Sequence, residues 1–255
     1  MGVGNFLFLF FAAGFAGFVD SVAGGGGLVQ LPALLIGVSN KPIPLILGTN
    51  KVPSIFGTSS AALSYFKKVR PDLRLTAMMA LPAFVGSILG AHLASHFPTA
   101  VFHPLILTLL VVVGIYTWIR PQLGMEEKLR FTHRRRHGVV ALCGLLIGFY
   151  DGIFGPGTGT ILVFLLVMVI GYEFIKASAT AKLVNIATNF GAILTFQFSG
   201  HIWWKLGLAL AVANVSGALI GSRLALRGGS PLVRKVFLIV VAILIAKLSY
   251  DWFWN

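Results

Sequence analysis

Four ionisable side chains stand inside stretches of sequence that are otherwise apolar. They are Asp20 and Asp151, each a few residues before a glycine-rich interruption, and Lys51 and Lys182. At the centre of a lipid bilayer a charge costs about 2.5–3.5 kcal/mol on insertion scales, so such residues are usually paired, protonated or beside a wet cavity. Three roles are open for the carboxylates: carrying a proton, capping exposed N–H groups at the helix break, or neutralising a lysine in the pairs Asp20–Lys51 and Asp151–Lys182.

Further polar residues follow each lysine at helical spacing. In the second half of the chain they recur at positions i, i+4, i+7 and i+11, which share one face of a helix. The equivalent positions of the first half are also polar from the lysine onward. The two stripes are Ser178, Lys182, Asn185 and Asn189, and Leu47, Lys51, Ser54 and Thr58.

This combination of groups suits an oxyanion. An ammonium group supplies charge, hydroxyl and amide groups donate hydrogen bonds, and a broken helix adds backbone N–H groups at the positive end of its dipole. We therefore expect the two stripes to face one polar site. The residues expected to contact the anion are Lys51, Lys182, Thr49, Asn50, Ser54, Thr180, Asn185, Asn189, Gly24, Gly25, Gly26, Gly155 and Gly157.

The sequence gives no sign of an enzyme, a metal site or a cofactor. Cys143 has no base beside it in the sequence, and the His92/His96 and His133/His137 pairs lack a third ligand. The glycines at 24–27 are not followed by the Gly-Lys-Ser/Thr of a phosphate-binding loop. We predict no metal, no cofactor and no catalytic residue.

The composition predicts that these residues are carried by membrane-spanning helices. Of 255 residues, 57% are apolar and 11% are charged, and the mean hydropathy is +0.90. A soluble domain carries about 25% charged residues, and a helix crossing a core of ~30 Å needs about 20 apolar residues. We therefore expect an all-α polytopic membrane protein without a soluble domain. Its apolar segments are 5–38, 43–66, 73–97, 100–119, 138–170, 173–198, 203–226 and 232–253.

The chain contains an internal repeat with a constant offset of 131 residues. The offset superimposes the two aspartates, the two lysines and the two glycine-rich interruptions, and it aligns two Gly-x-x-x-Gly pairs whose spacing favours close helix packing. Similarity among apolar residues alone does not explain such matches. The matched positions include Gly17-Phe18-x-Asp20 with Gly148-Phe149-x-Asp151, Thr49-x-Lys51 with Thr180-x-Lys182, and Gly86/Gly90 with Gly217/Gly221.

The basic residues indicate how the two repeats are oriented. The net charge of +13 would suggest nucleic acid in a soluble protein, but in a membrane protein Lys and Arg collect in cytoplasmic connections, so we expect no nucleic-acid partner. The connection 67–74, the linker 120–137 and the connection 227–235 are basic, whereas the counterparts of the first and last are not. All three connections can lie on the cytoplasmic side only if the segment 138–170 enters and leaves the membrane on the same face. Residues 158–170 span only ~20 Å, which is too short to cross the membrane alone.

We therefore predict two inverted repeats, each a broken-helix (re-entrant) hairpin followed by three transmembrane helices. The expected parts are a first repeat over 1–119, a basic cytoplasmic linker over 120–137 and a second repeat over 138–255, with both chain ends outside. No Lys or Arg precedes Lys41, so we expect the first segment to be retained rather than cleaved as a signal peptide. Eight plain crossings with parallel repeats are the alternative.

The motifs together resemble a known family. Residues 17–27 (Gly-Phe-Val-Asp-Ser-Val-Ala-Gly-Gly-Gly-Gly), Gly48-Thr49-Asn50-Lys51 and Ala179-Thr180-Ala181-Lys182 are similar to the sulfite exporter TauE/SafE family, from about residue 10 to 250. The resemblance implies a multi-pass permease of the bacterial inner membrane for small sulfur-containing anions such as sulfite, thiosulfate or organosulfonates. Pro156 and Thr158 interrupt the second glycine run, so the two hairpins need not have equal roles.

The function expected is secondary transport, as an exporter, of a small anion by alternating access. Export down the anion's own gradient and coupling to protons through Asp20 or Asp151 are both open. The partners expected are the anion and the lipid bilayer, and assembly into a homo-oligomer is also open. Two competing functions are an anion-selective channel that uses the same lysines, and a membrane enzyme with an aspartate as general base.

Overall fold

The computed structural model describes residues 2–94, 111, 115, 117–119, 122, 124–131 and 133–254, and these residues form helices and connections without a strand. Most of the segment expected over 100–119, and part of the linker expected over 120–137, lie outside them. The helices are α1 (Val3–Ala23), α2 (Gly27–Gly37), α3 (Ile43–Val69), α4 (Leu73–Leu93), α6 (His133–Ile153), α7 (Thr158–Leu165), the π-helix η2 (Leu166–Ile170), α8 (Phe174–Phe198) and α9 (Trp204–Trp254).

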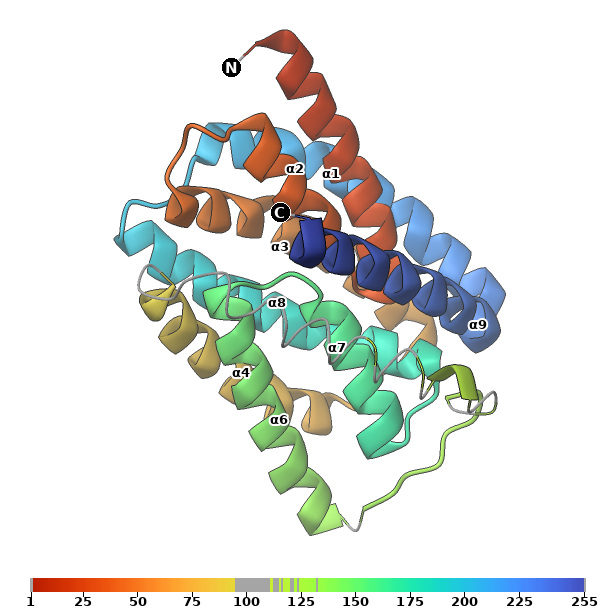
Figure 1. Cartoon of the computed structure of the whole chain (residues 1–255). Helices are drawn as coiled ribbons and strands as arrows, with labels where there is room; N and C mark the ends of the chain where they lie inside the picture. The colour runs from red at the N-terminus through yellow and green to blue at the C-terminus, as the bar shows by residue number, and fades with distance from the viewer. Residues whose placement is uncertain are drawn as a thin grey trace.

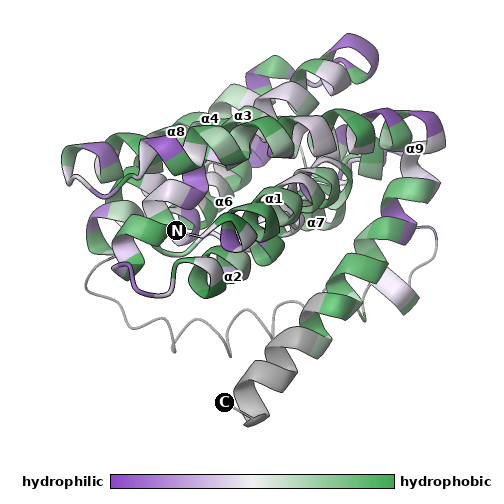
Figure 2. Cartoon of the chain, turned by 90° about the horizontal axis from the view of Figure 1, so that it is seen from above, coloured by the Kyte–Doolittle hydropathy of each residue, from purple (hydrophilic) through white to green (hydrophobic). Residues whose placement is uncertain are grey.

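The helix starts follow the repeat. Three pairs of helices begin 131 residues apart: α2 and α7, α3 and α8, and α4 and α9. Helix α6 begins at His133, inside the segment expected as linker. Helix α9 is two helices separated at Gly229, whose φ of 61° and ψ of −163° are not helical, and Pro231 follows. Figure 2 shows the change of direction there, between the two segments that the sequence analysis places at 203–226 and 232–253.

Each half begins with a helical hairpin, as the glycine interruptions predict. Helix α1 ends at Gly24, which has a φ of 81° and donates its N–H to the carbonyl oxygen of Asp20 at 2.8 Å. The chain then reverses into α2, and in the second half α6 reverses into α7 in the same way. Figure 1 shows the first hairpin descending from the upper edge of the molecule and the second rising from the lower edge.

The tips of the two hairpins touch each other near the middle of the molecule. The backbone N–H of Thr160 donates to the carbonyl oxygen of Gly24 at 3.0 Å. A Cβ atom added to Gly24 would lie 2.3 Å from the carbonyl carbon of Gly159, which is too close for any side chain. Glycine is therefore required here both for the left-handed backbone and for the contact.

The most extensive helix contacts join one half of the chain to the other. Helix α1 packs on α9 and α6 packs on α4, while α3 and α8 pack on each other in the centre. The glycine pairs allow this close approach, because a Cβ at Gly217 would lie 1.8 Å from the carbonyl oxygen of Gly14, and one at Gly86 would lie 2.2 Å from that of Leu145. The two halves are therefore interlocked rather than side by side.

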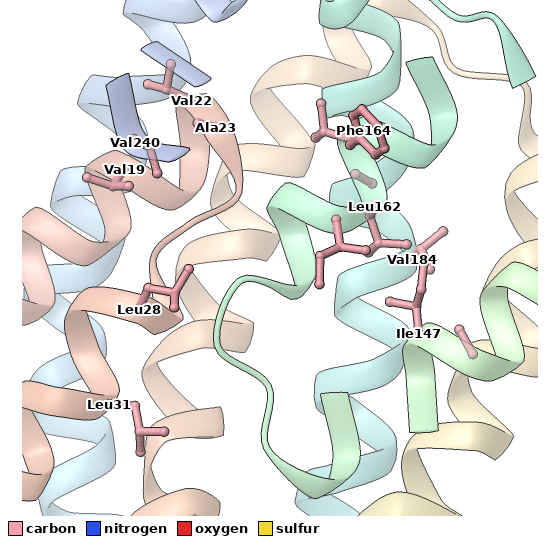
Figure 3. Close-up of a cluster of buried hydrophobic side chains, with 14 of the residues drawn as sticks. Val19, Val22, Ala23, Leu28, Leu31, Ile147, Leu162, Phe164, Val184 and Val240 are labelled. Atoms are coloured by element: carbon pink, nitrogen blue, oxygen red, sulfur yellow. The ribbon is translucent and has the colours of Figure 1, made fainter. Parts of the chain in front are cut away.

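Buried apolar side chains hold the hairpins in place (Figure 3). Val22 of α1 lies beside Val240 of α9, and Leu162 of α7 lies near Val184 of α8 and Ile147 of α6. In a lipid environment such contacts stabilise the fold mainly through van der Waals packing, since lipid tails are as apolar as the side chains.

The outer faces of the helices are also apolar. By length and hydropathy, four described helices are candidate membrane spans: Val3–Ala23, Leu73–Leu93, Arg135–Ile153 and Trp204–Ile243. Large apolar side chains on them are widely exposed, for example 73% for Phe11, 68% for Leu81 and 63% for Val212. Helices α3 and α8 carry the polar stripes, and 13 of the 27 residues of α3 and 15 of the 25 residues of α8 are buried. The polar stripes therefore lie inside a shell of apolar helices.

Connections from several parts of the chain gather around Tyr172. Burial, together with the nearby carboxylates of Asp72 and Glu127, raises the pKa of Tyr172 to about 12, and Arg136 opposes this. Glu127 forms an ion pair of 2.8 Å with Lys176. Ser230, in the connection 227–235, donates to the carboxylate of Glu173 and accepts the N–H of Ile175, so the three basic connections meet at one end of the molecule.

The connections 38–42 and 199–203 lie together at the upper left of Figure 1. There the ammonium of Lys41 stands 5.6 Å from the centre of the Trp203 ring. The backbone N–H of Trp203 donates to the hydroxyl of Thr49 at 2.9 Å.

Candidate substrate-binding site

A small polar cavity lies where the hairpin tips meet the two central helices. Its volume is about 20 Å³, which is enough for roughly one water molecule and too small for a polyatomic anion. The cavity in this conformation is therefore closed. It is lined by Asp20, Gly24, Gly27, Asn50, Lys51, Ser54, Thr58, Asp151, Gly155, Gly157, Thr158, Gly159, Asn185 and Asn189.

Lys51 of α3 forms a buried ion pair with Asp151 of α6. Its Nζ lies 3.0 Å from Oδ2 of Asp151 and donates to the backbone oxygen of the same residue at 2.6 Å. The hydroxyl of Thr158 donates to Oδ1 of Asp151 at 2.7 Å. Both charged side chains are only 3% exposed, so the pair is desolvated and depends on these mutual contacts.

Lys182 of α8, in the second half, makes the equivalent contact with the first half. It binds the backbone of Asp20 but not its carboxylate. Its Nζ donates to the backbone oxygen of Asp20 at 2.9 Å and stands 5.2 Å from the centre of the Tyr65 ring. The carboxylate of Asp20 instead accepts a hydrogen bond of 3.0 Å from the hydroxyl of Thr58. No described carboxylate forms an ion pair with Lys182.

Both lysines thus bind the end of a broken helix. Asp20 and Asp151 each lie in the last turn of a helix, at the negative end of the helix dipole. A cation is stabilised at such a position.

The pairs Asp20–Lys51 and Asp151–Lys182, considered from the sequence, do not form. The interlocking of the halves brings α3 to the end of α6 and α8 to the end of α1, so each lysine contacts the aspartate of the other half.

Most of the residues expected to bind an anion are close together. Those lining the cavity are Lys51, Asn50, Ser54, Asn185, Asn189, Gly24, Gly155 and Gly157, with both aspartates. Lys182 and Asp20 line an adjacent narrow space, which also includes Gly24, Gly159 and Asn185.

Four expected residues lie away from the cavity lining. The hydroxyl of Thr49 donates to the backbone oxygen of Leu45 and accepts the N–H of Trp203 near the end of the bundle. The buried hydroxyl of Thr180 has no hydrogen-bond partner among the described residues. A Cβ at Gly25 would meet Val240, and one at Gly26 would meet Asp20 and the backbone of α1, so both glycines are packing positions.

Two further polar residues behind the cavity are absent from the expected set. Gln30 and Asn214 are buried, with 2% and 3% exposure, and are hydrogen-bonded to each other and, through Gln30, to Asn50. Each is a polar residue inside an apolar segment. The criterion that singles out the lysines would have found them.

The described residues contain no group of three or more His, Cys, Asp and Glu side chains placed to hold a metal ion. The polar site is made of two ammonium groups, two carboxylates, hydroxyls, amides and helix ends. Such a set can bind a small charged molecule through hydrogen bonds and charge, and proton transfer at an aspartate is the chemistry that it adds.

Comparisons with known proteins give a consistent result. The family model described as sulfite exporter TauE/SafE matches residues 9–248. A probable membrane transporter protein, ORF9, of Sinorhizobium sp. is 39% identical over 96% of this chain and 92% of its own length. A probable membrane transporter protein of Haemophilus influenzae is 35% identical over 98% and 97%, and YfcA of Escherichia coli K12, also a probable membrane transporter protein, is 37% identical over 95% and 89%. No solved structure matches the chain.

Proposed function

The chain belongs to the sulfite exporter TauE/SafE family, and we propose that it exports a small anion, a sulfur-containing oxyanion or organosulfonate such as sulfite, across the bacterial inner membrane. It is a multi-pass membrane transporter and not an enzyme. The observation that carries the proposal is the crossed attachment of the two lysines: Lys51 and Lys182 each donate to the hairpin of the other half of the chain, beside the polar cavity.

Lys182 is the cation that an anion meets first. With all four groups ionised, the two lysines and two aspartates sum to zero, and Lys51 already has Asp151 as its counter-ion. Lys182 holds a backbone carbonyl instead, and an anion can replace that carbonyl with a stronger charge-assisted hydrogen bond. Asn50 and Asn185 then supply further hydrogen bonds from the cavity wall, whereas the hydroxyls of Ser54 and Thr58 already donate to the backbone oxygen of Asn50 and to the carboxylate of Asp20.

Transport requires the hairpin tips to separate, because the cavity of about 20 Å³ does not admit the anion. The two halves, 1–119 and 138–255 joined by 120–137, act as inverted repeats with hairpins that enter from opposite faces. The gathering of basic connections around Tyr172 supports a cytoplasmic location for that end. Movement of one hairpin at a time opens the site to one side and then to the other.

The proposal allows two energy sources for export: the gradient of the anion itself and a proton gradient. An anion that moves down its own gradient needs no further group, whereas coupling to protons would use Asp20 or Asp151. A channel requires a continuous pore, and the closed cavity favours a transporter over it.

Uptake into proteoliposomes of ³⁵S-labelled sulfite, thiosulfate, sulfate and taurine tests the proposal. Loss of a hydrogen bond to a charged group costs ~1.5–3 kcal/mol, so Lys51→Met and Lys182→Met should each reduce uptake of the best substrate by about tenfold or more. Lys205→Met, at an exposed lysine, is the matched control and should transport normally.

The proposal is overturned if none of these compounds accumulates, or if both variants fold and transport as the wild type does. Uptake that does not respond to an imposed pH gradient would remove the proton-coupled alternative.

A further inference from the structure

Three buried amide side chains form a chain of hydrogen bonds that ends at the cavity. Nδ2 of Asn214, on α9, donates to Oε1 of Gln30 at 2.7 Å. Nε2 of Gln30, on α2, donates to Oδ1 of Asn50 at 2.9 Å and to the backbone oxygen of Asn50 at 3.1 Å. All three residues are at most 3% exposed, and only Asn50 reaches the cavity lining.

The direction of this chain is fixed by the backbone of Asn50. A carbonyl oxygen accepts hydrogen bonds and cannot donate them, so the Gln30 atom beside it is the nitrogen. The oxygen of Gln30 therefore faces Asn214, and the side-chain atom of Asn50 that faces Gln30 is its oxygen. The NH₂ group is then the part of the Asn50 side chain left for the cavity.

The second half of the chain orients an amide by a similar device. Nδ2 of Asn189 donates to the backbone oxygen of Asn185 at 2.8 Å, which fixes the orientation of Asn189. The same nitrogen contacts Oδ1 of Asn185. The NH₂ group of Asn185, which also lines the cavity, is thus left for a ligand in the same way.

The internal repeat does not duplicate the hydrogen-bonded chain through Gln30. At the offset of 131 residues, the positions equivalent to Gln30, Asn50 and Asn214 are Ile161, Ala181 and Ala83, all apolar. Burying three amide side chains costs free energy, and the three apolar residues at the equivalent positions avoid this cost. The hydrogen bonds between the amides offset the cost of burying them. Such an arrangement on one side of an otherwise repeated site points to a role in recognition rather than in the fold.

We propose that Gln30 and Asn214 are positioning residues that hold Asn50 with its NH₂ group toward the substrate, so that Asn50 and Asn185 together select an oxyanion whose oxygens only accept hydrogen bonds. This inference rests on the proposed anion transport and adds how the anion is distinguished from molecules that also donate. Rotation of the Asn50 amide would place its oxygen against an anionic oxygen and weaken binding.

A double-mutant cycle on KM tests the inference, with the compound of the four above that the wild type takes up best as the probe. Gln30→Met keeps the length of the side chain and removes all three of its hydrogen bonds. A neutral hydrogen bond contributes about 1 kcal/mol, so we expect KM to rise about fivefold or more with little change in the maximal rate. Ile161→Met, at the equivalent apolar position, is the matched control.

Because Gln30 acts through Asn50, the double variant Gln30→Met/Asn50→Leu should have the KM of Asn50→Leu alone. Effects on KM that multiply, or a wild-type KM in Gln30→Met, overturn the inference. If Gln30→Met does not fold, Asn214→Ala serves instead, with a smaller rise in KM expected and an unchanged KM counting against the proposal. Failure of the wild type to transport any probe would instead refute the proposed function itself.

Discussion

The ammonium of Lys51 lies 3.0 Å from the carboxylate of Asp151, and the two residues belong to different halves of the chain. Lys182 repeats the arrangement in reverse by donating to the backbone oxygen of Asp20. Since the helix contacts also cross between the halves, neither half can satisfy its own lysine or bury its own hairpin.

The interlocking predicts that the halves are stable only together. Fragments 1–119 and 120–255, each expressed alone, should be degraded, whereas the two expressed together should co-purify. Gly217→Leu in the second fragment should abolish co-purification, because its side chain would collide with the backbone of α1 at Gly14. Gly138→Leu, where nothing lies within 4 Å of an added Cβ, is the control. Stable expression of either fragment alone would contradict the prediction.

The two aspartates should differ in their effect on stability. Asp151→Asn breaks a buried ion pair, which generally costs about 3–5 kcal/mol, so the melting temperature in detergent should fall by roughly 10 °C. Asp20→Asn keeps an oxygen for Thr58 and the backbone carbonyl for Lys182, so its melting temperature should stay within roughly 4 °C of the wild type.

Removing both members of the Lys51–Asp151 pair provides the control for this comparison. Lys51→Met/Asp151→Leu leaves no unpaired charge and should recover part of the lost stability. Equal losses for Asp20→Asn and Asp151→Asn would show that the two sites are energetically equivalent.

The contact between the hairpin tips should be needed for transport. Gly24→Ala places a side chain at positive φ, which costs ~1–2 kcal/mol, and 2.3 Å from Gly159. Gly159→Ala has no positive φ but would bring Cβ to 2.4 Å from the carbonyl oxygen of Gly24, so it tests the contact alone. Both should lose most uptake, while Gly4→Ala, in open space, should not. Normal uptake by Gly159→Ala would show that the tips need not touch.

Cysteine labelling distinguishes inverted repeats from eight plain crossings. In a Cys143→Ser background, Ser39→Cys and Ser199→Cys should both react with a membrane-impermeant maleimide in intact cells. Lys67→Cys and Glu126→Cys should react only after the membrane is opened. All four positions are exposed. Eight plain crossings would instead place residues 39 and 199 on opposite faces.

Much of the architecture is predictable from the sequence because it is repeated. The constant offset aligns the helix starts, the glycine interruptions fall at the hairpin tips, and the polar stripe from Lys51 to Ser54 faces the cavity. Such features depend on residues that are close together in the sequence, so the periodicity of the sequence reveals them.

Contacts between repeats are not visible in the same way. A repeat shows that Lys51 and Lys182 are equivalent, but not whether each contacts the aspartate of its own copy or of the other. Thr49 shares a short motif with Lys51 yet points to Trp203, because residues two apart on a helix face different directions. Gln30 matches no polar residue in the other half, so the search for repeats passes over it.

The ion pair between Lys51 and Asp151 also affects the order of events during biosynthesis. The two residues are 100 positions apart, so at about 5–20 residues per second the ribosome takes roughly 5–20 s to deliver the counter-ion after the lysine has emerged. Throughout that interval Lys51 lacks the carboxylate that pairs with it in the folded protein. We therefore expect the helix that carries Lys51 to reach its final position only after the second half has been synthesised.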